Sequence, residues 1–461
     1  MKRHWYDYIP HPVIMLFSIL ILAAVMTHFL PAGVFEREVI DGQSRVVPGS
    51  YHTVTPTPVG IMDLFMALPA GFRTASGVIF VVLTSGIMFG IMERTGTIEN
   101  IVGRLIHRIG LERRFLLVFL LTYLFGLLGV VVGYENNIAI IPIAAVVSLA
   151  LGGDLVLAAG LSVGAITVGF GTSPINPYTV GVGHKIAEMP MFSGWWLRSI
   201  LCFGALTLTA WYNMRYFRRI IKDPKQSLSE GLDTGGLQLS RPLDAYRVSA
   251  ANGLTALVFA LGMGYMLYGI FTYHWSFPQI AAVFVMTSIG IGIVNRMPSK
   301  DFSNTALQAV ALVAPGAFMV GYATSIKEVL EMGQINDTIS HYLSTLLVGL
   351  PTTLSAVGMS ICQSTINMLI PSGSGQALAT LPVMIPLGEN LGLTRQVTIL
   401  AFQIGDGLTN LFNPALGGMI AMLSLCRVPF DRWLRFVLPL TGLLLLFAWL
   451  LLVLAVWVGY A

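Results

Sequence analysis

The chain has 461 residues, of which 55% are hydrophobic and 10% are charged, and its mean hydropathy is +0.77. Since soluble domains carry about 25% charged residues, the composition excludes an ordinary soluble domain and indicates an all-α polytopic membrane protein of roughly ten to twelve spans. The net charge of +4 is interpreted as membrane topology rather than affinity for nucleic acid, because Lys and Arg collect in cytoplasmic loops.

The first sixty residues predict one span and one external loop. Three basic residues lie near the start of the chain (Lys2, Arg3 and His4), and an apolar run follows from residue 10 to about residue 30. This run is longer than a signal-peptide core, so we interpret it as a retained first span. The basic start places the N-terminus in the cytoplasm, and the polar residues 31–60 are expected to be external.

The next segment predicts a span, a surface helix and a hairpin. A span covers about 77–92, and residues 97–114 combine apolar side chains at helical spacing with four arginines. That pattern is typical of an amphipathic helix on the cytoplasmic surface. In 115–153 the limb 138–150 is short for a crossing. We expect a re-entrant hairpin with its tip at 135–137, although two ordinary helices would give the same topology.

A broken helix, a linker and three spans complete the middle of the chain. The helix that begins at Asp154 is expected to break at 171–177. The segment 218–246 is basic and then rich in Gly, Ser and Asp, which predicts a cytoplasmic linker. The three spans cover about 196–216, 248–271 and 279–294.

The second half repeats features of the first half. Residues 92–102 resemble residues 329–339, and each half ends in an Asn-Pro pair, Asn176-Pro177 and Asn413-Pro414. The surface helix of the first half carries four arginines, whereas its counterpart at 335–350 carries no Lys or Arg. Opposite charge at matching positions predicts two inverted repeats.

These observations divide the chain into five parts. We expect an N-terminal span with its external loop, a first inverted repeat, a cytoplasmic linker, a pair of connecting spans and a second inverted repeat. Their boundaries are 1–60, 61–217, 218–246, 247–300 and 301–461.

The stretch 403–419, QIGDGLTNLFNPALGGM, is the centre of the functional hypothesis. It places Asp406, several glycines and the second Asn-Pro pair inside an apolar run. A break in a spanning helix persists only inside protein or beside a water-filled cavity, and an acid at the bilayer centre costs roughly 2.5–3.5 kcal/mol. Paired interrupted segments in two halves of a chain indicate a transporter's binding site. The structural alternative is that Asn and Ser only join helices and Gly only allows close packing.

Three groups of polar residues are candidates for binding a substrate or an ion. They share hydroxyl, amide or carboxylate oxygens, or glycines that expose backbone amides, inside apolar surroundings. The candidates are Glu135, Asn136, Asn137, Thr172, Ser173, Asn176, Ser364, Thr365, Asn367, Ser372, Gly373, Ser374, Gln376, Asp406, Thr409, Asn410 and Asn413. If Na⁺ is bound, we expect it at Asn137, Thr172, Asn176, Asn367, Thr409 and Asn413.

The blocks NMLIPSGSGQALATLPVMIPL and LTRQVTILAFQIGDGLTNLFNP resemble the YfcC branch of the DcuC-type carriers, within the ion transporter superfamily. The resemblance implies two inverted repeats, each with a re-entrant hairpin and a broken helix. It also implies a bacterial inner-membrane homodimer whose transport domains move against scaffold domains, as in an elevator. Both hairpin tips depart from the Ser-Asn-Thr of that superfamily, which puts the sodium sites of its symporters in doubt here.

The sequence therefore predicts a secondary active transporter rather than an enzyme. No catalytic set, cofactor motif or metal-spaced His or Cys cluster is found, and the expected coupling ion is Na⁺ or H⁺. We expect a small carboxylate-bearing solute, such as a basic amino acid, moved by exchange or symport. A dicarboxylate site should present a cation, but the candidate sites contain no Lys or Arg. They contain Glu135 and Asp406 instead, and either acid would pair with a cationic group of the substrate. The alternative is a carrier of four-carbon dicarboxylates or short-chain acids coupled to Na⁺ or H⁺. A channel or a membrane enzyme is a remote alternative.

Overall fold

The computed structural model describes residues 12–40, 43–47, 49–237, 243–273, 275–347 and 349–461. Within these ranges the chain is mainly helical, as expected, and seven helices are long and apolar enough to cross a membrane. This number is below the ten to twelve spans expected from length. The difference arises because α1 and α6 are short apolar helices and because several crossings are built from interrupted pieces.

The first half of the chain forms ten helices, whose order follows the sequence prediction. A π-helical turn, Gly160–Gly164, joins two of them, and another, Pro177–Gly181, follows the first helix break. The helices described are α1 (Pro12–Phe29), α2 (Ile61–Thr74), α3 (Ser76–Arg94), α4 (Thr97–Ile109), α5 (Arg114–Val132), α6 (Ile141–Ala150), α7 (Leu155–Ala159), α8 (Ala165–Thr172), α9 (Val182–Ile186) and α10 (Trp195–Lys222).

The second half follows a similar order. Its helices are α11 (Ala250–Tyr273), α12 (Phe277–Val294), α13 (Ser299–Met332), α14 (Asn336–Thr345), α15 (Thr352–Asn367), α16 (Gly373–Asn390), α17 (Arg395–Thr409), α18 (Gly417–Leu425) and α19 (Phe430–Trp457). The predicted external loop contains two small antiparallel pairs, β1 with β4 and β2 with β3. These strands are β1 (Gly33–Val34), β2 (Arg37–Ile40), β3 (Gln43–Val46) and β4 (His52–Thr53).

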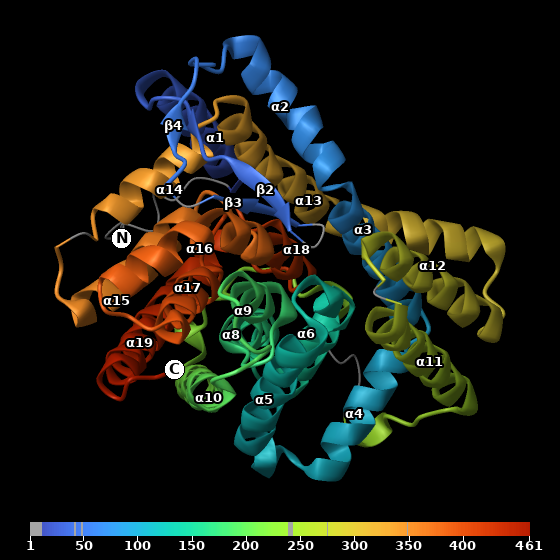
Figure 1. Cartoon of the computed structure of the whole chain (residues 1–461). Coiled ribbons are helices and arrows are strands. Elements are labelled where there is room, and N and C mark those ends of the chain that lie inside the picture. The colour runs from blue at the N-terminus through green and yellow to red at the C-terminus, as the bar shows by residue number, and fades with distance from the viewer. Residues whose placement is uncertain (1–11, 41–42, 48, 238–242, 274, 348) are drawn as a thin grey trace.

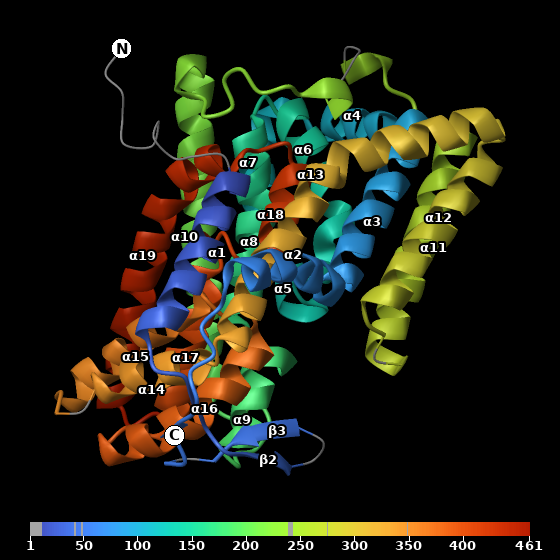
Figure 2. The ribbon, with the colours of Figure 1, turned by 90° about the horizontal axis from the view of Figure 1, so that it is seen from above.

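Two helical hairpins enter the protein from opposite faces (Figure 2). The pair α5–α6 enters beside α4, and the pair α15–α16 enters from the face that carries β2 and β3. The Ser372 hydroxyl caps α16 by accepting a hydrogen bond from the Gly375 N–H at 3.3 Å. At the first tip Asn136 is half-buried and Asn137 is buried, whereas at the second tip Ser372 is exposed and Gly373 and Ser374 are half-buried.

The linker is anchored to the helical core through Asp154. Its carboxylate caps α7 by accepting from the Leu157 N–H at 2.7 Å. The same side chain accepts from the hydroxyls of Tyr216 and Ser227, each at 2.6 Å. Because α10 continues to Lys222, regular helix extends into the predicted linker, and the irregular segment begins after that residue.

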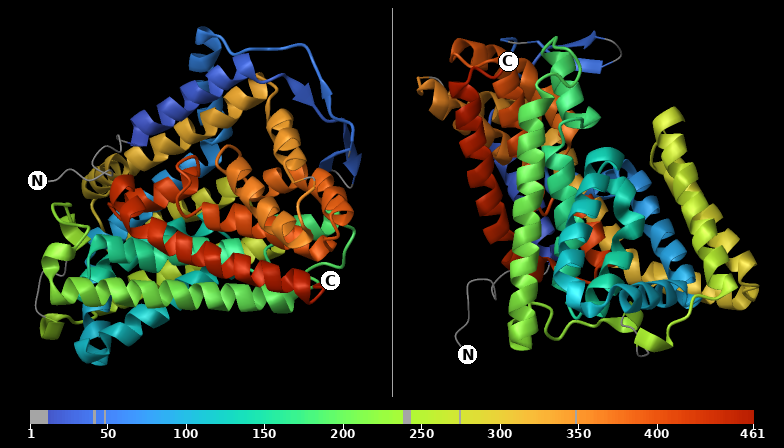
Figure 3. Two further views of the ribbon diagram at one scale, coloured as in Figure 1. Left: turned by 90° about the vertical axis from the view of Figure 1, so that its left-hand side faces the viewer. Right: turned by 90° about the horizontal axis from the view of Figure 1, so that it is seen from below.

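A second group of helices packs beside the hairpins and broken helices. Helix α13 packs against α1, α2, α3 and α18, while α12 packs against α3 and α11. Figure 1 shows α11 and α12 projecting beyond α3. Figure 3 shows α10 and α19 side by side on the other flank, where the two helices are in contact. The core thus lies between two sets of long helices.

The two interrupted helices cross at a point where two glycines meet. A Cβ added to Gly407 would lie 2.5 Å from the Cα of Gly171, and one added to Gly171 would lie 2.6 Å from the Cα of Gly407. No side chain fits between these backbones, so only glycine permits the crossing. Through this contact the breaks of the two halves are brought together.

We predict that Gly407→Ala lowers the thermal unfolding midpoint of the purified protein by several degrees. The added methyl overpacks the crossing, and overpacking costs about 1–3 kcal/mol. Gly442→Ala in α19 is the matched control, since nothing lies within 4 Å of its Cβ position and alanine favours helix. Equal midpoints for the two variants would contradict the close crossing.

Candidate functional site

A cavity of about 660 Å³ lies where the hairpin tips and helix breaks converge. Asn136 comes from the first tip and Tyr178 from the first break. Ser372 and Ser374 come from the second tip, and Asn410 comes from the second break. Most of the remaining wall consists of aliphatic and aromatic side chains, with α3, α11, α12 and the turn between α11 and α12 forming one side of it. The cavity is within the size range of small-molecule sites.

Two asparagines fix the second tip to the second break. The Asn367 amide donates to the Asp406 carbonyl at 3.0 Å and to Asn410 Oδ1 at 2.8 Å. In return, the Asn413 amide donates to the Asn367 carbonyl at 2.6 Å, and Asn413 Oδ1 accepts from the Ala415 N–H at 2.9 Å. These bonds satisfy backbone groups that the broken helix leaves free.

Asn176 performs the same task at the first break. Its amide donates to the Phe170 carbonyl at 2.9 Å, and its Oδ1 accepts from the Tyr178 N–H at 2.8 Å. Ser173 donates to the Val130 carbonyl at 3.3 Å, which joins this break to α5. The matched Asn-Pro pairs of the sequence therefore form matched backbone contacts.

Asp406 is the most unusual group beside the cavity. Its side chain is buried, with the residue 1% exposed, and in the described part of the chain neither carboxylate oxygen has a hydrogen-bond partner. Oδ2 lies 3.5 Å from the Cβ position of Gly373, which itself lines the cavity. A buried polar atom without a partner is costly, so this carboxylate requires a proton, a cation or a charged substrate group.

Other buried oxygens without partners accompany Asp406. They are Asn367 Oδ1, Thr179 Oγ1 and Gln376 Oε1. The Thr179 methyl lies 2.6 Å from the same Cβ position of Gly373 that Asp406 approaches, so the two side chains are neighbours across the second tip. Such a set, dominated by acceptors, suits a group that donates hydrogen bonds or carries positive charge.

The structure brings most of the candidate residues together. Five line the cavity, namely Asn136, Ser372, Gly373, Ser374 and Asn410. Others are buried in the breaks and tips next to it, namely Asn137, Thr172, Ser173, Asn176, Asn367, Gln376, Asp406, Thr409 and Asn413. Ser364 is half-buried and donates to the Gly405 carbonyl at 3.3 Å. The Glu135 side chain lies outside the described part of the structure.

Thr365 does not belong to the cavity. It is exposed on α15, and its hydroxyl donates to the Ile361 carbonyl at 3.0 Å. The reason is helical phase, since Asn367, two residues later, faces the core while Thr365 faces outward.

The oxygen atoms expected to hold Na⁺ are largely engaged in other contacts. The Thr172 and Thr409 hydroxyls donate to carbonyls one turn earlier, those of Val168 and Gly405. Asn176 and Asn413 accept from backbone N–H groups, as described above. Of the expected set, Asn367 keeps a buried oxygen without a partner. A hydroxyl that donates keeps its oxygen lone pairs, so both threonines remain able to ligate a cation, and Asp406 adds two buried oxygens without a hydrogen-bond partner in the described residues.

Sequence reasoning missed a buried cation behind the first break. Arg198 is fully buried, and its guanidinium donates to Gln403 Oε1 at 3.1 Å, Gln396 Oε1 at 2.7 Å and the Tyr460 hydroxyl at 2.8 Å. Gln403 in turn donates to the Ser173 carbonyl at 2.8 Å. The available signal was an arginine inside the apolar run WWLRSILCF. This run was interpreted only as the start of the span 196–216.

Comparison with known proteins places this geometry in context. The family described as "C4-dicarboxylate anaerobic carrier", DcuC, matches residues 9–457. The chain is 30% identical over 499 aligned residues to the "Putative basic amino acid antiporter YfcC" of Escherichia coli strain K12, covering 99% of this chain and 98% of that protein. It is 29% identical over 416 aligned residues to an uncharacterized protein of Haemophilus influenzae, covering 89% and 81%.

Two solved structures show more distant similarity. The YdaH transporter of Alcanivorax borkumensis has a TM-score of 0.44 at 18% identity, with 98% of this chain and 99% of that chain covered. MtrF of Neisseria gonorrhoeae, described among antimetabolite efflux pumps, also has a TM-score of 0.44, at 17% identity, with 97% and 95% covered. Both scores lie below the level at which a shared fold follows.

We predict that Asn413→Ala and Asn176→Ala each destabilise the protein by about 1–3 kcal/mol, because each leaves buried backbone groups without a partner. The thermal unfolding midpoint in detergent measures this effect. Thr365→Ala is the control and should leave the midpoint unchanged within about 0.5 kcal/mol, as expected for an exposed side chain. Wild-type midpoints in both asparagine variants would show that the breaks do not depend on these amides.

Proposed function

The chain belongs to the DcuC family and is a membrane transporter rather than an enzyme, and from this premise we propose that it moves a small amino acid, preferably a basic one, by alternating access. The observation that carries the proposal is the buried Asp406 carboxylate beside the cavity. An ammonium or guanidinium group of the substrate would satisfy it.

The electrostatic character of the cavity supports an amino acid over a dicarboxylate. No Lys or Arg is among the described residues that line it, whereas recognition of two carboxylates normally uses paired cationic groups. The backbone N–H groups of Gly373 and Ser374 lie in the first turn of α16, where helical N–H groups have no partner within the helix, and they would bind a single carboxylate. The name of the Escherichia coli relative, a putative basic amino acid antiporter, agrees with this assignment.

The second candidate is a four-carbon dicarboxylate or a short-chain organic acid, as the family description suggests. In that case Asp406 would carry a coupling H⁺ or bind Na⁺ together with Asn367, and the anion would depend on backbone amides. The buried guanidinium of Arg198 favours this candidate, because it adds positive charge behind the first break.

We also propose the topology that such a carrier requires. The regions 61–217 and 301–461 form inverted repeats, the N-terminus and the linker 218–246 are cytoplasmic, and the protein is a homodimer in the bacterial inner membrane. The opposed hairpins support the inversion (Figure 2). So does the charge of the surface helices, since α4 carries arginines and α14 contains no Lys or Arg.

A ligand screen by thermal stabilisation tests the substrate class. Ligand at 100 times its dissociation constant adds about 2.7 kcal/mol to the folded state. We expect stabilisation by arginine, ornithine or lysine and none by succinate or fumarate, each measured with and without Na⁺ and at two pH values. Stabilisation by dicarboxylates with Na⁺ would replace the amino-acid assignment with the second candidate.

Asp406→Asn tests the role of the carboxylate. We predict that uptake of radiolabelled L-arginine into proteoliposomes falls at least about tenfold, since a change of 1.4 kcal/mol in binding is tenfold. Thr365→Ala, which is exposed and outside the cavity, should retain wild-type uptake. Full transport by Asp406→Asn with an unchanged pH dependence would refute the assigned role.

A further inference from the structure

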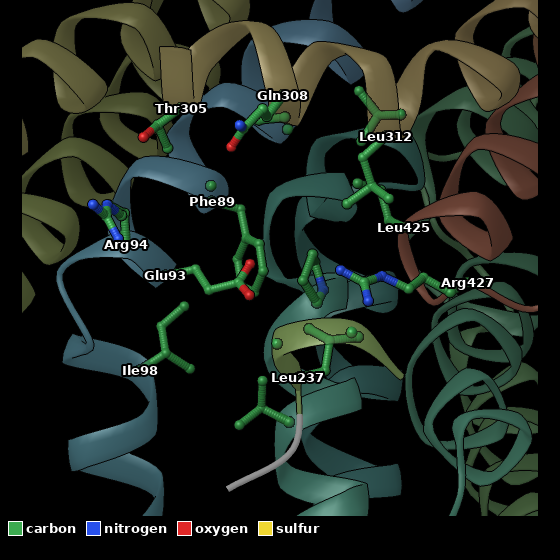
Figure 4. Close-up of a pocket in the computed structure, with 18 of the residues that line it drawn as sticks. Phe89, Glu93, Arg94, Ile98, Leu237, Thr305, Gln308, Leu312, Leu425 and Arg427 are labelled. Atoms are coloured by element: carbon green, nitrogen blue, oxygen red, sulfur yellow. The ribbon is translucent and has the colours of Figure 1, made fainter. Parts of the chain in front are cut away.

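A second and larger cavity lies apart from the candidate site. Its volume is about 920 Å³, and its described lining shares no residue with the central cavity. The walls come from α3, α4, α6, α13, the linker turn Gly235–Leu237 and the end of α18 with the residue Arg427. Figure 4 shows this cavity with Thr305 and Gln308 on one side and Leu237 on the other.

Some charged side chains of this cavity form an ion pair or a hydrogen bond, and others form neither within the described residues. Arg94 pairs with Asp301 at 3.8 Å, and Glu99 accepts from the Tyr246 hydroxyl at 2.6 Å. Within the described residues, neither the Glu93 carboxylate nor the Arg427 guanidinium forms a hydrogen bond or a direct ion pair. Figure 4 shows these two half-buried side chains pointing toward one another across the cavity.

The linker backbone passes close to both charged groups. A Cβ at Gly236 would collide with Glu93 Oε1, and one at Gly235 would collide with Arg427 Nη1. Glycine at both positions therefore lets the linker backbone pass directly beside a carboxylate and a guanidinium. The result is an anion on one wall and a cation on the opposite wall, with the glycine turn of the linker close to both.

We infer that this cavity binds an α-amino acid, with the Arg427 guanidinium on its carboxylate and the Glu93 carboxylate on its ammonium. A guanidinium binds a carboxylate through two parallel hydrogen bonds, and opposed charges hold a zwitterion in one orientation. Among the described lining residues, three carboxylates face two guanidiniums, and this net negative charge favours a basic side chain. Asn304 and Thr305 of α13 supply neutral polar groups for that side chain.

This inference deepens the proposed function and rests on it, because it names basic amino acids as the solute class and adds a second binding site for them. The linker and the basic residues around the cavity lie on the face proposed as cytoplasmic. The second binding site would therefore hold the cytoplasmic solute before exchange. Binding there is nevertheless measurable without transport.

Protection of an introduced thiol tests the site. Gln308 is exposed in the cavity lining, and the three native cysteines are buried, so Gln308→Cys provides a local reporter in the full-length protein in detergent. We expect saturating L-arginine to slow its alkylation by N-ethylmaleimide at least fivefold. Agmatine, which lacks the carboxylate, and butyrate, which lacks the cations, should not slow it.

Variants then separate this site from the central one. In the Gln308→Cys background, Glu93→Gln and Arg427→Gln should each abolish protection, while Arg104→Gln, an equal charge change on the exposed face of α4, should preserve it. Asp406→Asn should also preserve protection, even though it impairs uptake. If L-arginine protects but no uptake is found, the proposed function fails while the second site stands.

Four results would overturn the inference. The first is a wild-type alkylation rate that L-arginine leaves unchanged. The second is protection that persists in both Glu93→Gln and Arg427→Gln, which would place the ligand elsewhere. The third is loss of protection in Asp406→Asn, which would make protection an indirect effect of the central site. The fourth is protection by agmatine equal to that by L-arginine, which would exclude recognition of a carboxylate.

Discussion

The architecture depends on satisfying backbone hydrogen bonds where two membrane helices are interrupted. Inside a bilayer no water is available to replace a lost helical bond. Asn176 and Asn413 supply the replacement in the same manner, since each accepts from an N–H two residues later and donates to a carbonyl. Once the breaks are stable, glycine and serine at the second tip can line a cavity at that depth.

The same constraint explains why charge is tolerated in the interior. Asp406 has no described partner for its carboxylate, and Arg198 contacts several neutral acceptors. Both groups are connected through α17, because Gln403 binds Arg198 and lies one turn before Asp406. Within the described residues the Asp406 carboxylate nevertheless has no hydrogen-bond partner, which leaves it available to a ligand.

Features with local causes could be predicted from the sequence, and features with distant causes could not. The Asn-Pro breaks and the surface helix α4 each follow from residues that are close together in the sequence. The contact of Arg198 with Gln403 joins positions 205 residues apart. Thr179 carries no distinguishing pattern at all, and it is near Asp406 only because the two halves meet. Thr365 was misjudged because a hairpin tip in sequence does not specify which face of the helix points inward.

The glycine crossing has a mechanical consequence. With no side chain between Gly171 and Gly407, the crossing offers no rotamer that can rearrange, so the two interrupted helices travel as one rigid piece. In the proposed alternating-access cycle, both breaks would therefore move as one unit against α13, which packs on α18 next to the second break.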